Sequence, residues 1–113
     1  HLGTLAHGEQ FIYNAMNCLR PGGLAVHTTE FNISSNQDTI DNGPSVIYRQ
    51  KDFEKIAHKL RSQGHKIELD FSLGNDPLDL HVDTLPYKQD VHLRLKIGAY
   101  ICTSFGLIIE KGA

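Results

Sequence analysis

The short run Arg20-Pro21-Gly22-Gly23 divides two segments whose apolar residues repeat with different periods. Before this run, apolar residues at helical spacing predict a helix over 5–19. Pro21 cannot continue the hydrogen-bond ladder of a helix, and the two glycines allow a sharp reversal of the backbone. After the run, segment 24–29 begins with unbroken apolar residues, which predicts a strand covered on both faces of a sheet. A helix that turns directly into a buried strand is typical of an α/β domain.

The rest of the chain extends this pattern. Polar and turn-forming residues predict a loop over 32–45, and amphipathic spacing predicts a second helix over 50–63. Alternating apolar and polar side chains predict a strand over 66–73 with one buried face. β-branched and aromatic residues favour a long strand over 97–110, with a bend or bulge around Gly106. The order of these elements predicts an α/β fold that begins with a βαβ-like unit.

Length and charge exclude several classes of function. The 113 residues are enough for one small domain, and a hydrophobic content of 40% is enough for a core. A net charge of −2 without a cluster of basic residues argues against nucleic-acid binding. No apolar run approaches the roughly 20 residues of a membrane span, and no signal peptide is visible. We therefore expect neither a nucleic-acid nor a membrane partner.

The two cysteines, Cys18 and Cys102, both lie in apolar stretches. This pattern favours two buried free thiols in a cytoplasmic protein, with a disulfide or a reactive thiol as the alternatives. The chain begins at His1 rather than at a methionine, which favours a cleavage product or a fragment over a natural N-terminus.

The order of elements and the run Leu19-Arg20-Pro21-Gly22-Gly23-Leu24-Ala25-Val26 resemble the C-terminal half of the class I S-adenosylmethionine-dependent methyltransferases. In this Rossmann-like family, a helix ends in a Leu-Lys/Arg-Pro-Gly-Gly turn that leads into the fifth strand. The resemblance implies that 66–73 and 97–110 are the sixth and seventh strands. The seventh would then insert antiparallel between the other two, in a three-stranded mixed sheet. As an order of elements the resemblance covers nearly the whole chain, but its specific motif covers only 19–26.

The sequence lacks the half of that family that holds the cofactor. No Gly-x-Gly-x-Gly run is present, and Gly22-Gly23 precedes a strand instead of following one. The opening residues His1 and Leu2 resemble the segment that follows the family's fourth strand, so the resemblance implies that they contact the cofactor. We therefore expect residues 1–113 to form a single partial domain. By resemblance, S-adenosylmethionine belongs to an intact parent protein, and the isolated chain is expected to be inactive.

The best candidates for chemistry lie where the strand over 24–30 ends, because ligands of open α/β sheets bind beyond the carboxyl ends of the strands. His27 or Glu30 is expected to act as a general base on a small-molecule acceptor, or to ligate a metal. Thr29 and Asn32 are expected to contact that acceptor under the following loop. The alternatives are a histidine satisfied within the strand and a glutamate that pairs locally.

A second polar segment contains Asp79, His81 and Asp83, which alternation would place on one side of an extended chain. Such a set suits a divalent cation, although a solvated loop edge is the favoured interpretation, and we predict no metal site. The family often inserts acceptor-recognition elements here, so by analogy Tyr87 and His92 are expected to form part of a substrate lid.

Two classes of function remain open: a methyltransferase fragment, and a non-enzymatic α/β interaction module that self-associates. Under the fragment interpretation, the strand over 24–30 lacks its neighbour and exposes an apolar, unpaired edge. We therefore expect a homo-oligomer formed through that edge, or by exchange of the first helix.

Overall fold

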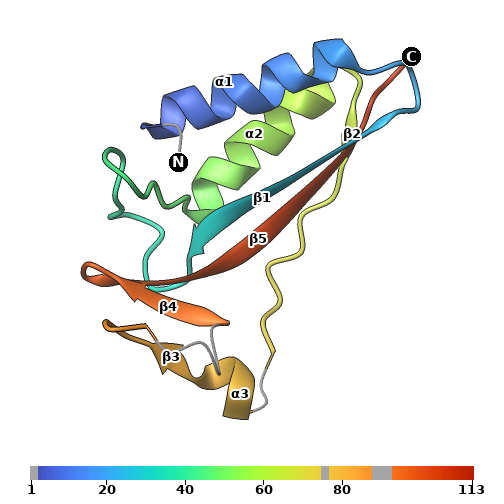
Figure 1. Ribbon diagram of the computed structural model, residues 1–113. Helices are drawn as coiled ribbons and strands as arrows, with labels where there is room; N and C mark the ends of the chain where they lie inside the picture. The colour runs from blue at the N-terminus through green and yellow to red at the C-terminus, as the bar shows by residue number, and fades with distance from the viewer. Residues whose placement is uncertain (1–2, 75–76, 88–92) are drawn as a thin grey trace.

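The computed structural model describes residues 3–74, 77–87 and 93–113. Two long helices pack on one side of a twisted five-stranded sheet (Figure 1). In chain order the elements are α1 (Leu5–Ala15), the 3-10 turn η1 (Met16–Cys18), β1 (Leu24–Asn32), α2 (Gln50–Ser62), β2 (Lys66–Ile67), α3 (Pro77–Leu80), β3 (Val82–Asp83), β4 (Arg94–Ile97) and β5 (Tyr100–Glu110). The predicted α/β class, mixed sheet and flanking helices are confirmed.

The first predicted helix is shorter than the apolar pattern indicated. α1 ends at Ala15, and η1 completes the segment before the turn at 20–23. The turn is tied to the far end of the chain: the Gly22 N–H donates to the Lys111 carbonyl, and the Lys111 N–H donates to the Gly23 carbonyl, both at 2.8 Å. Gly22 adopts a φ of 82°, in the region that favours glycine. The Pro-Gly-Gly run therefore turns the chain into β1 and joins this end of β1 to the residue that follows β5.

β5 is the centre of the sheet. It pairs antiparallel with β1 along the full nine residues of that strand, from Leu24 opposite Glu110 to Asn32 opposite Cys102. On its other edge, the C-terminal end of β5 pairs antiparallel with β2. The last strand therefore lies antiparallel between β1 and β2.

The predicted strand over 66–73 is largely wrong, because only Lys66–Ile67 join the sheet. Ile67, Leu69 and Phe71 still face the core, as the alternation predicts. The Asp70 carboxylate accepts hydrogen bonds from the Ser72 N–H at 2.9 Å and from the Ser72 hydroxyl at 2.6 Å. This local turn competes with strand pairing, as short polar side chains often do.

The predicted long strand over 97–110 divides into a hairpin. The chain reverses at Gly98, whose φ of 59° suits a tight turn, and β4 runs back along β5. There is no bulge at Gly106, because the ladder with β1 passes through Gly106 opposite Thr28 without interruption. β3 adds parallel to β4, so the sheet has five strands in place of the predicted three.

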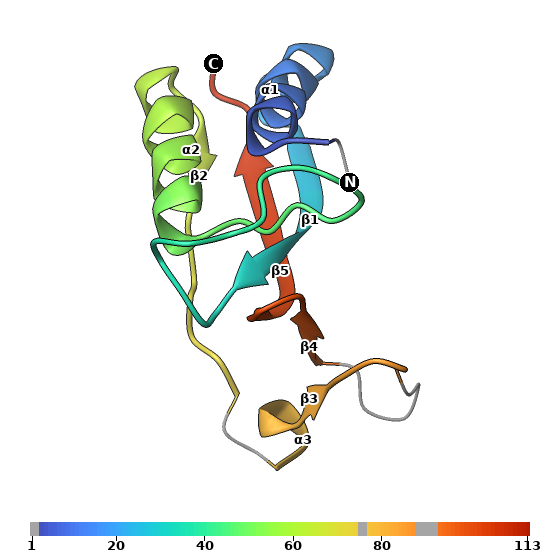
Figure 2. The ribbon, with the colours of Figure 1, turned by 90° about the vertical axis from the view of Figure 1, so that its left-hand side faces the viewer.

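Aromatic side chains fill the space between the helices and the sheet. Phe53 of α2 stacks on Phe105 of β5 with ring centroids 4.5 Å apart, and on Tyr48 at 5.3 Å. Phe31 and Phe71 pack at the edge of the same cluster. Both α1 and α2 lie over this face of the sheet (Figure 2).

The opposite face of the sheet is uncovered by any described helix, which contradicts the prediction that both faces of 24–29 are buried. Leu24 and Val26 of β1 are 59% and 65% exposed, and Ile108 opposite Val26 is 58% exposed. The cysteines also differ from prediction: both are free and Cys102 is buried, but Cys18 at the end of η1 is exposed. Within the described residues, no helix is both long and apolar enough to cross a membrane.

Phe53 is fully buried at the centre of the aromatic cluster, so we predict that Phe53→Ala lowers the free energy of unfolding by about 3–5 kcal/mol. Phe11→Ala is the control, since its ring is 54% exposed and the loss should stay below about 1 kcal/mol. Urea denaturation followed by circular dichroism measures both. Equal losses in the two variants would contradict this description of the core.

Candidate functional site

A cavity of about 450 Å³ lies between α1 and the outer edge of β1. One wall comes from α1 and its N-cap, another from 26–30 of β1, and a third from the end of the loop that precedes α2. Its lining residues are Thr4, Gly8, Phe11, Ile12, Val26, His27, Thr28, Thr29, Glu30, Val46, Tyr48 and Ser104. Three of the predicted site residues, His27, Thr29 and Glu30, are thus brought to one cavity.

Gly8 and Tyr48 shape the N-terminal end of this cavity. A Cβ atom at Gly8 would overlap the Tyr48 hydroxyl, so glycine allows the phenol to lie directly against α1. Tyr48 is buried and stacked on Phe53, which leaves the ring little room to move away. Burial raises the pKa of Tyr48, so the phenol stays protonated at neutral pH.

His27 lies beneath the exposed ring of Phe11, in an edge-to-face contact with ring centroids 5.9 Å apart. Its Nε2 atom is buried, and it has no hydrogen-bond partner among the described residues. Burial lowers the pKa of His27, which favours the neutral imidazole at pH 7. A neutral imidazole can accept a proton, which is what a general base requires.

Glu30 lies on the other face of β1 from His27, because side chains alternate along a strand. It lies beside the thiol of Cys102, and burial together with the nearby Glu30 raises the pKa of that thiol to about 12. Cys102 is therefore a protonated, unreactive thiol. His27 and Glu30 therefore do not form a catalytic dyad. Both line the cavity because the cavity extends around the outer edge of β1.

The other two predicted residues of β1, Thr29 and Asn32, both make hydrogen bonds within the fold. The Thr29 hydroxyl donates to the carbonyl of Phe105 at 3.0 Å, across the β1–β5 ladder. Asn32 is only 2% exposed and is absent from the cavity lining. Its Oδ1 atom accepts from the N–H groups of Ser34 and Ser35 at 3.0 Å, and its Nδ2 donates to the carbonyl of Asp38. Asn32 organises the loop rather than contacting the cavity.

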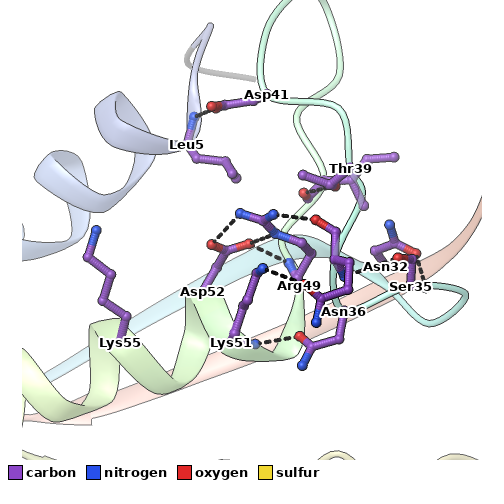
Figure 3. Close-up of polar contacts among 12 residues, drawn as sticks. Leu5, Asn32, Ser35, Asn36, Thr39, Asp41, Arg49, Lys51, Asp52 and Lys55 are labelled. Atoms are coloured by element: carbon purple, nitrogen blue, oxygen red, sulfur yellow. Dashed lines mark hydrogen bonds and ion pairs between the residues drawn. The ribbon is translucent and has the colours of Figure 1, made fainter.

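Hydrogen bonds and an ion pair hold the predicted loop over 32–45 against the two helices (Figure 3). Asp41 accepts from the N–H of Leu5 at 2.7 Å, and the Asn36 side chain accepts from the N–H of Lys51 at 2.9 Å. Arg49 pairs with Asp52 at 2.7 Å in the first turn of α2. The loop thus joins the N-terminal ends of both helices, and it leads into Val46 and Tyr48, which line the cavity.

The other predicted residues lie elsewhere. The Tyr87 hydroxyl donates to the carbonyl of Lys96 at 2.6 Å, next to β4, and Tyr87 is not among the residues that line the cavity. His92, and the predicted cofactor contacts His1 and Leu2, lie outside the described residues.

The segment that contains Asp79, His81 and Asp83 is not the single extended chain that alternation suggested. It passes from α3 into β3, with His81 exposed and Asp83 buried. Within the described part of the chain, no group of three or more His, Cys, Asp or Glu side chains is placed to hold a metal ion.

Sequence reasoning missed Gly8, Phe11 and Tyr48 as cavity residues. A glycine inside a helical pattern is a signal of close packing, and it was the one available clue to the contact with Tyr48. No local sequence pattern predicts Tyr48 as a cavity residue, because its position depends on the path of the loop.

Comparison with models of protein families, with curated proteins and with solved structures found no match to this chain.

Asn32→Ala removes the acceptor and donor that organise the loop, so we predict a loss of about 2–3 kcal/mol in the free energy of unfolding. Asn36→Ala, at an exposed asparagine of the same loop, should cost about 1 kcal/mol or less. Chemical denaturation distinguishes the two. An Asn32→Ala protein as stable as the Asn36→Ala protein would argue against the structural role.

His27 should titrate below its ordinary pKa of 6.5 because burial disfavours the imidazolium ion. In the pH range between its folded pKa and 6.5, the unfolded chain binds more protons. This contribution to stability is therefore complete above pH 6.5 and is lost as the pH falls toward the folded pKa. NMR titration of the ring protons measures the midpoint. Phe11→Ala exposes His27 to water and should move the midpoint back toward 6.5, whereas an unchanged midpoint would contradict the assigned cause.

Proposed function

We propose that this chain is the C-terminal half of a Rossmann-like, S-adenosylmethionine-dependent methyltransferase that acts on a small-molecule acceptor, and that these residues alone are inactive. The observation that carries the proposal is the position of β5, antiparallel between β1 and β2. That strand order is what the resemblance of the Leu19–Gly23 turn and the following elements implies. A cytoplasmic location is part of the proposal, supported by the two free cysteines.

The uncovered face of the sheet also supports the proposal. Parallel and mixed α/β sheets normally carry helices on both faces, yet here α1 and α2 lie on the same face. On the other face, the apolar side chains of Leu24, Val26 and Ile108 are exposed to solvent. A further layer, such as a cofactor-binding half, would bury these side chains.

The cavity beside β1 is the proposed acceptor site. Its charged lining side chain is Glu30, with no lysine or arginine in the lining, which favours a neutral acceptor over an anionic one. Methyl transfer from an activated sulfonium needs mainly correct positioning of the acceptor. His27, neutral and with its Nε2 atom buried, is the proposed proton acceptor for a hydroxyl. Thr29 retains oxygen lone pairs as acceptors, because its proton goes to Phe105.

The described residues do not fit a complete cofactor site. Among residues 3–74, 77–87 and 93–113, no glycine-rich loop follows a strand, and β1 has no parallel neighbour that supplies an acidic residue for a ribose. We therefore assign no catalytic step to the cofactor within this chain.

Calorimetric titration of the chain with S-adenosylmethionine should show no binding in the micromolar range. The same titration, with the segment encoded upstream of His1 joined to the chain, should show binding and transfer of a labelled methyl group. Micromolar binding by the chain alone would contradict the assignment of the cofactor site to a missing half. An extended chain that neither binds nor transfers would end the methyltransferase proposal.

A second candidate function is a non-enzymatic module that works by self-association. The open outer edge of β1 favours it, since a sheet edge with unpaired backbone groups readily accepts another strand.

A further inference from the structure

The backbone of β1 has hydrogen-bonding groups on its outer edge. At its end, the carbonyl of Glu30 accepts from the N–H of Tyr48 at 2.8 Å, and the N–H of Asn32 donates to the Tyr48 carbonyl at 2.7 Å. The backbone groups of alternate residues point to the same side of a strand. The N–H and carbonyl groups of Leu24, Val26 and Thr28 therefore point to this outer edge as well.

No described residue pairs with these outward groups of Leu24, Val26 and Thr28. The cavity reaches β1 from both faces, since it is lined by Val26 and Thr28 from one face and by His27 and Thr29 from the other. The open space therefore follows the strand edge itself. Segment 24–29 contains no Asp, Glu, Lys or Arg, so it lacks the charges that usually protect an exposed edge.

We propose that a second copy of the chain occupies this edge, with the two β1 strands antiparallel around a two-fold axis at Val26. This inference specifies the interface for the second candidate function. In this register Val26 faces Val26 of the partner, and Leu24 faces Thr28. This register pairs Leu24, Val26 and Thr28 only with one another, and these are the residues whose N–H and carbonyl groups point outward. Every such group therefore has a hydrogen-bond partner in the second copy.

Two observations favour a second copy over a strand from another protein. The open edge is self-complementary under a two-fold rotation, as an isologous interface requires. Tyr48 occupies the edge at 30–32 and so limits pairing to the segment that this register uses.

Light scattering after size-exclusion chromatography tests the proposal on the full chain. The unmodified chain should be a dimer, and Val26→Lys should weaken dimerisation at least about tenfold by placing two like charges opposite each other. Ile108→Lys is the matched control, because Ile108 is the neighbour of Val26 on β5 and is similarly exposed but lies one strand away from the edge. It should leave the dimer intact. Thr28→Lys is a second edge variant, which places its lysine opposite Leu24 of the partner and no like charge, so it should weaken dimerisation less than Val26→Lys. Circular dichroism checks that all variants fold.

A spin label tests the register. In a Cys18→Ser background, a label at Val26→Cys should lie next to its counterpart, while a label at Ile108→Cys should be separated by about three strand spacings, or roughly 14 Å. Strong dipolar broadening only at Val26 supports the register, and equal broadening at both sites overturns it.

The outcomes separate the two proposed functions. A monomeric chain at high concentration overturns self-association through β1 but leaves the methyltransferase proposal to the calorimetric test. A dimer that Ile108→Lys disrupts and Val26→Lys does not would place the interface on the open sheet face and overturn the edge pairing.

Discussion

The antiparallel ladder between β1 and β5 is the interaction on which the other elements depend. These strands are far apart in the chain, yet they pair over nine residues, and the ladder continues into the hydrogen bonds between Gly22, Gly23 and Lys111. The side chain of Lys111 also donates to the carbonyl of Met16 at 2.6 Å, at the end of α1. The ladder thus connects the first helix, the turn and the C-terminal strand.

The end of the ladder also determines where polar side chains must satisfy the backbone of the loop. β1 ends at Asn32, where the chain must leave the sheet and reach α2. The buried amide of Asn32 satisfies the loop backbone, the Arg49–Asp52 pair begins the helix, and Val46, Ile47 and Tyr48 are buried between them. The cavity results from this arrangement, because the loop covers one end of the β1 edge and α1 covers one side, while 24–29 remains open.

Local patterns predicted some functional residues and missed others for identifiable reasons. His27, Thr29 and Glu30 were found because the end of a buried strand in an α/β sheet is a common ligand position, and all three line the cavity. Asn32 shares that position in sequence, but its side chain is needed by the loop. The contact of Gly8 with Tyr48 joins residues distant in sequence, so no periodicity could indicate it.

The sequence alone determined the elements whose signals are local. The amphipathic pattern of α2, the turn at Arg20–Gly23 and the apolar start of β1 are each encoded within a few consecutive residues, and the structure has them where they were predicted. Tertiary structure decided which edges pair and which faces are covered. The segment at 66–73 alternates like a strand, but a strand needs a partner, and only Lys66–Ile67 find one on β5. The apolar residues of β1 indicated burial, but burial of the open face depends on a layer that the described helices do not supply.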